Sequence, residues 1–158
     1  MTMLAQDSRT LFIGQAVKYG GQRAHATFAG VPMEKRIEMP ICEDFTVGFA
    51  TGLALEGYIP IVFIPRWDFL LLAANQIINH LDKFPLMSDL KPKVIFRTAV
   101  GRSATLDPGP QHTGNYTLPF RQMLKTMDVY ELFKADYIVP TYQKALESER
   151  SCIVVEHM

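Results

Sequence analysis

The sequence predicts an α/β fold, a three-layer α/β/α sandwich with a mostly parallel sheet. Short runs rich in β-branched and aromatic residues alternate along the chain with longer segments of helical periodicity. Several of the short runs are apolar at every position, as expected of strands that are buried on both faces. Such alternation implies right-handed crossovers, which place helices on both faces of the sheet.

Five segments have the composition of strands: residues 11–13, 36–41, 59–64, 93–98 and 152–156. A sixth strand is expected at either residues 129–132 or residues 137–139, where Pro140 interrupts the pattern.

Four segments have the pattern of helices: residues 43–56, 68–83, 118–125 and 135–149. The first stops at Gly57, and the second opens with Asp68 as its predicted N-cap. The 158 residues carry no internal repeat and no low-complexity segment, so they are expected to form one domain over residues 1–158.

Charge and cysteine usage narrow the class of protein. Sixteen basic residues balance sixteen acidic ones without a basic run, which argues against a nucleic-acid or membrane-surface partner. The most apolar region, residues 47–65, is interrupted by Glu56, Gly57 and Pro60 and therefore predicts a helix and a strand instead of a membrane span. Cys42 and Cys152 match no metal spacing, and without a signal peptide they are expected to be reduced thiols in the cytoplasm.

Two positions are expected in the crevice beyond the carboxyl ends of the strands, where α/β proteins bind ligands. Glu43 begins the helix after the second strand, and Phe69 lies in the first turn of the helix after the third. A carboxylate beside buried surface is costly unless it is paired or hydrogen-bonded. A structural interpretation stays open for both residues, because Glu43 and Asp44 would each gain ~0.3–1 kcal/mol from the helix macrodipole, and aromatic side chains commonly pack inward.

Four segments carry a resemblance to a known family: "YGG" (19–21), "RIEMPICEDFTVGFATGLALEGYIPIVFI" (36–64), "RWDFLLLAANQIINHLDK" (66–83) and "VIFRTAVG" (94–101). Together with "QHTG" (111–114), they resemble the pyrimidine-binding domain of thiamine-diphosphate enzymes of the transketolase type. The chain is most similar to the beta subunit of two-chain 2-oxo-acid dehydrogenases, such as those for pyruvate, branched-chain acids and acetoin. The resemblance implies the thiamine-diphosphate-binding fold in its pyrimidine module.

The resemblance also implies roles for individual residues. Glu43 matches the glutamate that contacts the aminopyrimidine ring nitrogen opposite the amino group, where it shares a proton and favours the imino tautomer. Phe69 matches the aromatic residue that stacks on the pyrimidine, and Trp67 would rim the same pocket. His112 matches an active-site histidine that contacts the substrate or acyl intermediate, although a surface-loop histidine remains the alternative.

Two departures from the family determine the expected partner. The chain contains no "G-D-G" followed by "N", the pattern that holds Mg²⁺ and the diphosphate in this superfamily. An alpha-like subunit with the diphosphate-binding domain is therefore expected to hold the Mg²⁺ and to share the thiamine diphosphate. The C-terminal domain of the beta subunits is expected to be lacking, since the chain ends at Met158.

These features predict the pyrimidine-binding subunit of a split thiamine-diphosphate enzyme acting on a 2-oxo acid or a ketose, inactive alone and oligomeric. The alternative is a non-catalytic assembly or regulatory module derived from such a subunit. The helix at residues 68–83 is expected to supply the apolar oligomer surface, through Leu70, Leu71, Ala74, Ile77 and Ile78.

Overall fold

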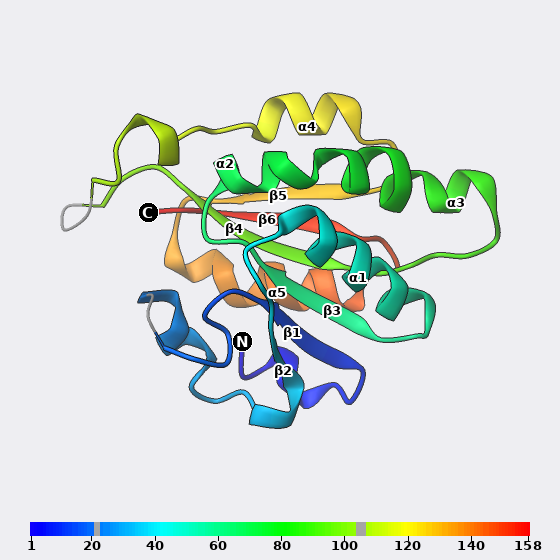
Figure 1. Ribbon diagram of the computed structural model, residues 1–158, viewed down its shortest axis with the longest axis horizontal. Helices are drawn as coiled ribbons and strands as arrows, with labels where there is room; N and C mark the ends of the chain where they lie inside the picture. Colours follow the sequence, from blue (N-terminus) through cyan, green and yellow to red (C-terminus); the bar gives the residue numbers. More distant parts are fainter. Residues whose placement is uncertain (21–22, 104–106) are drawn as a thin grey trace.

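Six parallel strands form one sheet in the computed structural model, which describes residues 1–20, 23–103 and 107–158 (Figure 1). The strands are β1 Thr10–Gly14, β2 Arg36–Glu38, β3 Ile59–Phe63, β4 Ile95–Val100, β5 Asp128–Leu132 and β6 Cys152–His157. Their order across the sheet is β2-β1-β3-β4-β6-β5, and every neighbouring pair is parallel. The predicted α/β class is confirmed, with a sheet that is parallel throughout.

Helices cover both faces of this sheet and complete three layers. They are α1 Glu43–Leu55, α2 Trp67–Leu70, α3 Phe84–Met87, α4 Thr117–Met123 and α5 Ile138–Glu147. The helices α1, α2 and α4 pack on one face, whereas α5 packs on the other with the N-terminal turn Leu4–Gln6 (Figure 1).

Alternation within the strands divides the core into two clusters. Successive side chains of a strand point to opposite faces. In β3, Ile61 and Phe63 join the cluster under α5, while Val62 joins the cluster under α1 and α2. In β6, Val154 lies under α5 and Val155 under the other layer. Because both faces are covered, the strands are apolar at consecutive positions.

The predicted helix at residues 68–83 is broken into several turns of different pitch. The α-helix α2 is followed by a 3-10 turn at Leu71–Ala73, a π-helix at Gln76–His80, a 3-10 turn at Leu81–Lys83 and then α3. The prediction of one continuous helix is therefore wrong. Apolar residues spaced three or four apart are compatible with all of these turns, so the sequence pattern does not distinguish them.

Boundaries elsewhere shift by a few residues. β2 stops at Glu38, before Pro40, which has no N–H to donate to a sheet. Of the two candidates for the sixth strand, Asp128–Leu132 is correct, and residues 137–139 belong to the turn Ala135–Tyr137 and the start of α5. Pro140 is tolerated there because the first turn of a helix needs no intrahelical N–H donor.

The described residues include no helix with both the length and the apolar character needed to cross a bilayer.

Candidate functional site

Glu43 and Asp44 begin α1 side by side but differ in burial. Glu43 is 5% exposed, whereas Asp44 is exposed and its Oδ2 accepts a 3.3 Å hydrogen bond from Gln76 Nε2. Among the described residues, the one hydrogen bond to the Glu43 carboxylate comes from Gln15 Nε2, 3.5 Å from Oε1. A macrodipole contribution is available to an exposed acid as well, so it does not explain why Glu43 is buried.

The loop after β1 brings Gln15 to Glu43. Glu38, at the end of β2, accepts hydrogen bonds from the backbone N–H groups of Ala16, Lys18 and Tyr19. Ala16 has a φ of 55°, in the left-handed region that non-glycine residues rarely adopt, and this turns the chain around the Glu38 carboxylate. Sequence patterns did not single out Gln15 or Glu38, because their contacts join distant segments of the chain.

Phe69 and His112 are in direct contact. Their ring centroids lie 5.2 Å apart with an interplanar angle of 85°, an edge-to-face arrangement. Phe69 comes from α2 and packs against the core cluster under that helix, while His112 ends the 3-10 turn Pro110–His112. His112 Nδ1 is buried and has no hydrogen-bond partner within the described residues. The structure thus brings together two predicted site residues that lie 43 positions apart in the chain.

All of these residues lie at one edge of the sheet. Because the strands are parallel, their carboxyl ends meet at this edge, and α1 and α2 begin there (Figure 1). Glu43 opens α1, and Phe69 lies in α2. This is the edge of the sheet at which the sequence predicts a ligand.

Asp68 does not cap the helix as predicted. The N-cap position is Arg66, which makes no capping hydrogen bond, and Asp68 lies inside α2. Its Oδ1 instead accepts hydrogen bonds from Gly114 N at 3.3 Å and Tyr116 Oη at 3.4 Å. An acid near the start of a helix can either cap the helix or accept hydrogen bonds from another segment, and the sequence pattern does not distinguish these two roles.

Trp67 lies in the core and not at the rim of a pocket. It is fully buried, and its ring packs on Phe120 of α4 at a centroid distance of 4.8 Å. Its contact with a cofactor stays a prediction. In this chain Trp67 packs α2, the helix that also carries Phe69, against α4.

The segment after His112 has a second anchor on the edge strand β5. Asn115 Nδ2 donates a 3.0 Å hydrogen bond to Glu131 Oε1, which also lies 2.8 Å from His157 Nε2. Burial alone would raise the pKa of Glu131, but the hydrogen bonds from Asn115 and His157 outweigh it and hold that pKa below its ordinary value. Glu131 is therefore an ionised acceptor at neutral pH.

The side chains at this edge of the sheet differ in what they can offer a ligand. Glu43 offers a buried carboxylate to a ring nitrogen, and Phe69 offers an aromatic face or edge. Within residues 1–20, 23–103 and 107–158, no three His, Cys, Asp or Glu side chains gather in the manner of a metal site.

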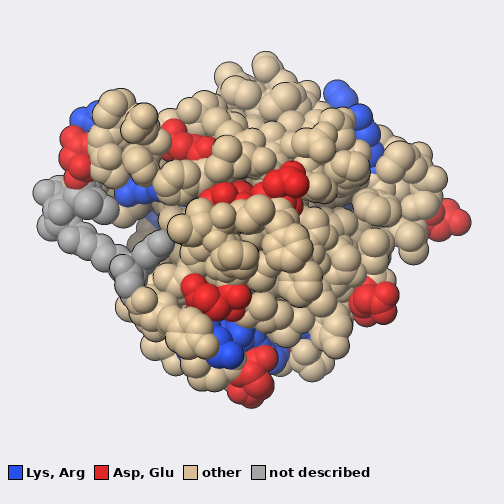
Figure 2. All heavy atoms as spheres, viewed as in Figure 1, with Lys and Arg blue, Asp and Glu red and all other residues tan. Residues whose placement is uncertain are grey.

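Exposed apolar side chains surround the start of α1. Ile41, Phe45 and Phe49 are exposed, and the rings of Phe45 and Phe49 stack at 6.1 Å. Leu72 is exposed on the turn after α2. In Figure 2, uncharged areas and acidic side chains occupy the middle of this face, while Lys and Arg lie toward its margins.

This surface differs from the predicted one. Leu70 and Ile77 were expected to form an oligomer surface, but both are fully buried in the core cluster. The buried side of this segment consists of residues spaced three or four apart, Leu70, Ala73, Ile77 and Leu81. Leu71 is exposed as predicted, and other exposed apolar side chains come from α1 and from α3, where Leu86 and Met87 are exposed.

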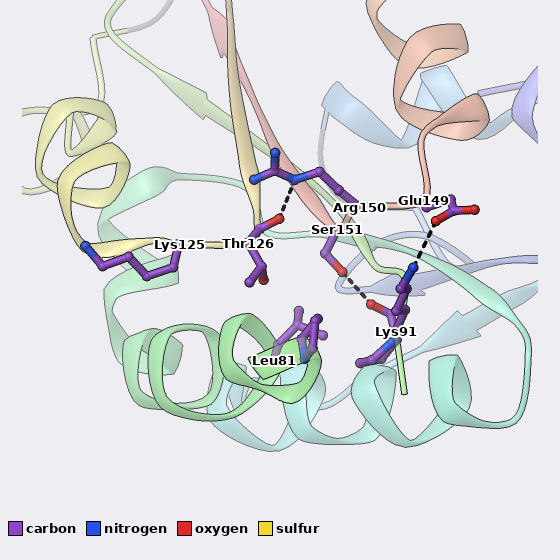
Figure 3. Close-up of a pocket in the computed structure, with 9 residues that line it drawn as sticks. Leu81, Lys91, Lys125, Thr126, Glu149, Arg150 and Ser151 are labelled. Carbon is purple, nitrogen blue, oxygen red and sulfur yellow. Dashed lines mark hydrogen bonds and ion pairs between the residues drawn. The ribbon is translucent and has the colours of Figure 1, made fainter. Parts of the chain in front are cut away.

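A cavity of about 240 Å³ lies at the opposite edge of the sheet (Figure 3). Its lining includes Lys91, Lys125, Glu149 and Arg150 near the amino ends of β4, β5 and β6. Lys91 pairs with Glu149 at 3.3 Å, and Arg150 pairs with Asp128 at 3.3 Å. The cavity contains none of the predicted site residues, and Lys91, Glu149 and Arg150 in its lining each take part in an ion pair.

Comparisons with known proteins agree with the fold and the residue pattern. The family described as "Transketolase, pyrimidine binding domain" matches residues 1–158. A mitochondrial 2-oxoisovalerate dehydrogenase subunit beta from Chaetomium thermophilum is 32% identical over 88 residues, which cover 52% of this chain and 18% of that protein. A 1-deoxy-D-xylulose-5-phosphate synthase from Methylococcus capsulatus is 32% identical over 128 residues, which cover 79% of this chain and 18% of that protein.

Solved structures share the fold at lower identity. A split-gene transketolase, described as an inactive beta4 tetramer, has a TM-score of 0.73 at 21% identity, with 98% of this chain and 47% of that chain covered. Transketolase from Campylobacter jejuni has a TM-score of 0.69 at 16% identity, with 98% and 23% covered. The chain spans less than a quarter of the two curated relatives named above and about half of the split-gene protein.

Proposed function

The chain belongs to the transketolase pyrimidine-binding domain family, and from this premise we propose that it binds the pyrimidine half of thiamine diphosphate in a split enzyme. A partner with the diphosphate-binding domain would complete the site and hold the Mg²⁺. The substrate would be a 2-oxo acid or a ketose: the dehydrogenase relative is named for a 2-oxo acid, and the matching family is named for transketolase.

The observation that carries this proposal is the burial of Glu43 at the carboxyl edge of the sheet. Its neighbour Asp44 is exposed and hydrogen-bonded at the surface, so the helix start itself does not require a buried acid. A carboxylate kept in such surroundings with one long hydrogen bond favours a role toward a ligand.

Each residue of the site would act on a different part of the ligand. Glu43 would share a proton with a pyrimidine ring nitrogen, and Gln15 would orient its carboxylate through the Oε1 contact. Phe69 would pack on the pyrimidine ring, contributing ~0.5–1.5 kcal/mol beyond the area it buries. His112, held against Phe69, would hold or move a proton at its imidazole near the substrate. Thiamine diphosphate, when bound, supplies the carbon nucleophile for the reaction.

The partner would cover the apolar side chains around α1. Ile41, Phe45 and Phe49 lie on or just before the helix that carries Glu43, and in a monomer these apolar side chains would be exposed to solvent. A diphosphate and its cation need oxygen ligands or gathered N–H donors, and the described residues offer no metal-binding group of acids. These two features support a site shared between chains.

Paired substitutions at the start of α1 test the proposal in the enzyme reconstituted with an alpha-like chain. Glu43→Gln should preserve folding and lower turnover by ~10²–10⁴, since an amide cannot supply the acid–base step. Asp44→Asn is the matched control and should leave turnover within about twofold. Both variants should melt close to the wild-type temperature, because the macrodipole contribution of each acid is ~1 kcal/mol or less.

Exchange of the cofactor's thiazolium proton gives the same comparison without a substrate. Glu43→Gln should slow the exchange in the reconstituted enzyme, and Asp44→Asn should not. Equal and small effects of the two substitutions would reject the role of Glu43 and favour a non-catalytic assembly module.

A further inference from the structure

We propose that Asp68 is a positioning residue that holds His112 against Phe69 by anchoring the segment that follows the histidine. The catalytic meaning of this position rests on the proposed function, whereas the contacts themselves belong to the chain alone.

One turn of helix provides both contacts with the histidine segment. Phe69 meets the His112 ring edge to face at 5.2 Å, and the adjacent Asp68 accepts hydrogen bonds from Gly114 N and Tyr116 Oη. Both donors reach the same oxygen, Oδ1. The other oxygen, Oδ2, is buried and has no hydrogen-bond partner among the described residues. The carboxylate is therefore committed to the segment that carries His112 and to no other part of the described chain.

The fit at Gly114 shows how close this approach is. A Cβ at position 114 would lie 2.6 Å from Asp68 Oδ1 and 2.6 Å from Tyr116 Oη. Both distances are well below van der Waals contact. A side chain at position 114 would therefore force the Asp68 carboxylate or the Tyr116 ring to shift, which gives a second way to disturb the anchor without removing the acid.

The far side of the same segment is fixed independently. Asn115 Nδ2 donates to Glu131, and Asn115 Oδ1 accepts a 3.0 Å hydrogen bond from Thr117 N at the start of α4. Loss of Asp68 should thus leave α4 in place and release mainly the turn at residues 110–114. The change at His112 should be local.

NMR of the full chain with ¹³C-labelled histidine tests this directly. The chain has four histidines, and His112→Gln assigns the resonance of interest. Asp68→Ala removes both hydrogen bonds, whereas Asp68→Asn keeps a carbonyl oxygen that can accept them. Asp89→Ala, at an exposed position, is the control for loss of an acid.

Asp68→Ala should move the His112 ring signals to the positions of a solvent-exposed imidazole, because the ring leaves the edge of Phe69. Asp68→Asn should restore most of the wild-type shift, and Asp89→Ala should change nothing. His157, which stacks on Phe133 at 4.2 Å, should stay unchanged in all three variants. Unchanged His112 signals in Asp68→Ala, or equal displacement in the Ala and Asn variants, would overturn the proposal.

Two milder variants decide the matter if Asp68→Ala fails to fold. Tyr116→Phe removes one of the two hydrogen bonds, and Gly114→Ala forces the Asp68 carboxylate or the Tyr116 ring away from position 114. Displacement of the His112 signals in both supports the anchor, and wild-type signals in both overturn it. Because no cofactor or partner is present, these results stand whether or not the enzyme activity proposed above is found.

Discussion

The two faces of the sheet hold their buried polar groups in different ways. Under α5, Arg97 makes two 2.9 Å hydrogen bonds to Glu156, and Tyr142 donates at 2.8 Å to the same carboxylate. On the face covered by α1, α2 and α4, the described chain leaves five buried side-chain atoms without a hydrogen-bond partner. They belong to Trp67, Asp68, Thr98, His112 and Thr117.

This difference in hydrogen bonding predicts a difference in stability between the two faces. An unpartnered buried polar atom costs ~1–3 kcal/mol, so a face that gathers several is not optimised for folding alone. The residues of the candidate site lie on that face. Under α5, Arg97 and Glu156 form an ion pair, and the buried Arg36 donates hydrogen bonds to backbone carbonyl oxygens of Val31 and Val17. Substitutions under α5 should therefore lower stability more than substitutions on the other face, whereas substitutions at the candidate site should have the larger effect on ligand binding.

The largest expected effect on stability comes from breaking the ion pair under α5. Glu156→Gln leaves the buried Arg97 charge without its carboxylate and should lower the free energy of unfolding by ~3 kcal/mol, measured by urea denaturation. The control is Glu149→Gln, whose pair with Lys91 is exposed and should matter by less than ~1 kcal/mol. Equal effects of the two would contradict the contrast between the faces.

A smaller effect depends on pH and on Cys152, which also lies under α5. Burial raises the pKa of this thiol to about 12 from an ordinary value of 9.0. Stability from the protonated thiol is therefore complete below pH 9 and is lost as the pH rises from 9.0 toward about 12.

Unfolding in urea at two pH values measures this loss. Between pH 8 and pH 10 the wild type should lose ~1.4 kcal/mol more than Cys152→Ala, since one pKa unit corresponds to that free energy. Cys42→Ala, at an exposed position, should keep the wild-type slope. A Cys152→Ala slope that matches the wild type would show that this thiol is not kept protonated by the fold.

The smallest effect is expected on the face of the candidate site. Thr117 has a buried hydroxyl without a partner, so Thr117→Val should change stability by less than ~1 kcal/mol and in either direction. Thr10, under α5, donates at 2.9 Å toward both Leu4 O and Asp7 O, and Thr10→Val should lower stability by ~1–2 kcal/mol. Thermal melts compare the two variants. A larger loss of stability for Thr117→Val than for Thr10→Val would contradict the difference between the two faces.

Local patterns were sufficient to predict the fold class and most elements. Apolar runs identified the five strands, and Gly57 marked the end of α1 within one residue. They were insufficient between α2 and α3, where turns of different pitch share one apolar spacing. There the structure buried Leu70 and Ile77, which the sequence had assigned to the surface.

The candidate site was predicted only in part, for a related reason. Glu43, Phe69 and His112 were selected by their positions and by resemblance, and the structure brings Phe69 and His112 into contact. The hydrogen bonds from Gln15 to Glu43 and from Gly114 to Asp68 span 28 and 46 positions. No local periodicity reports such contacts, so Asp68 was mistaken for a helix cap.

Calorimetric titration of thiamine diphosphate with Mg²⁺ tests the central claim, that this chain holds half of a shared cofactor site. The chain alone should bind weakly or not at all, and a mixture with an alpha-like chain should bind tightly. Phe69→Ala should weaken binding in the mixture, while Glu156→Gln should leave it unchanged. Sub-micromolar binding by the chain alone, more than about 8 kcal/mol, or equal binding by Phe69→Ala in the mixture, would contradict the account.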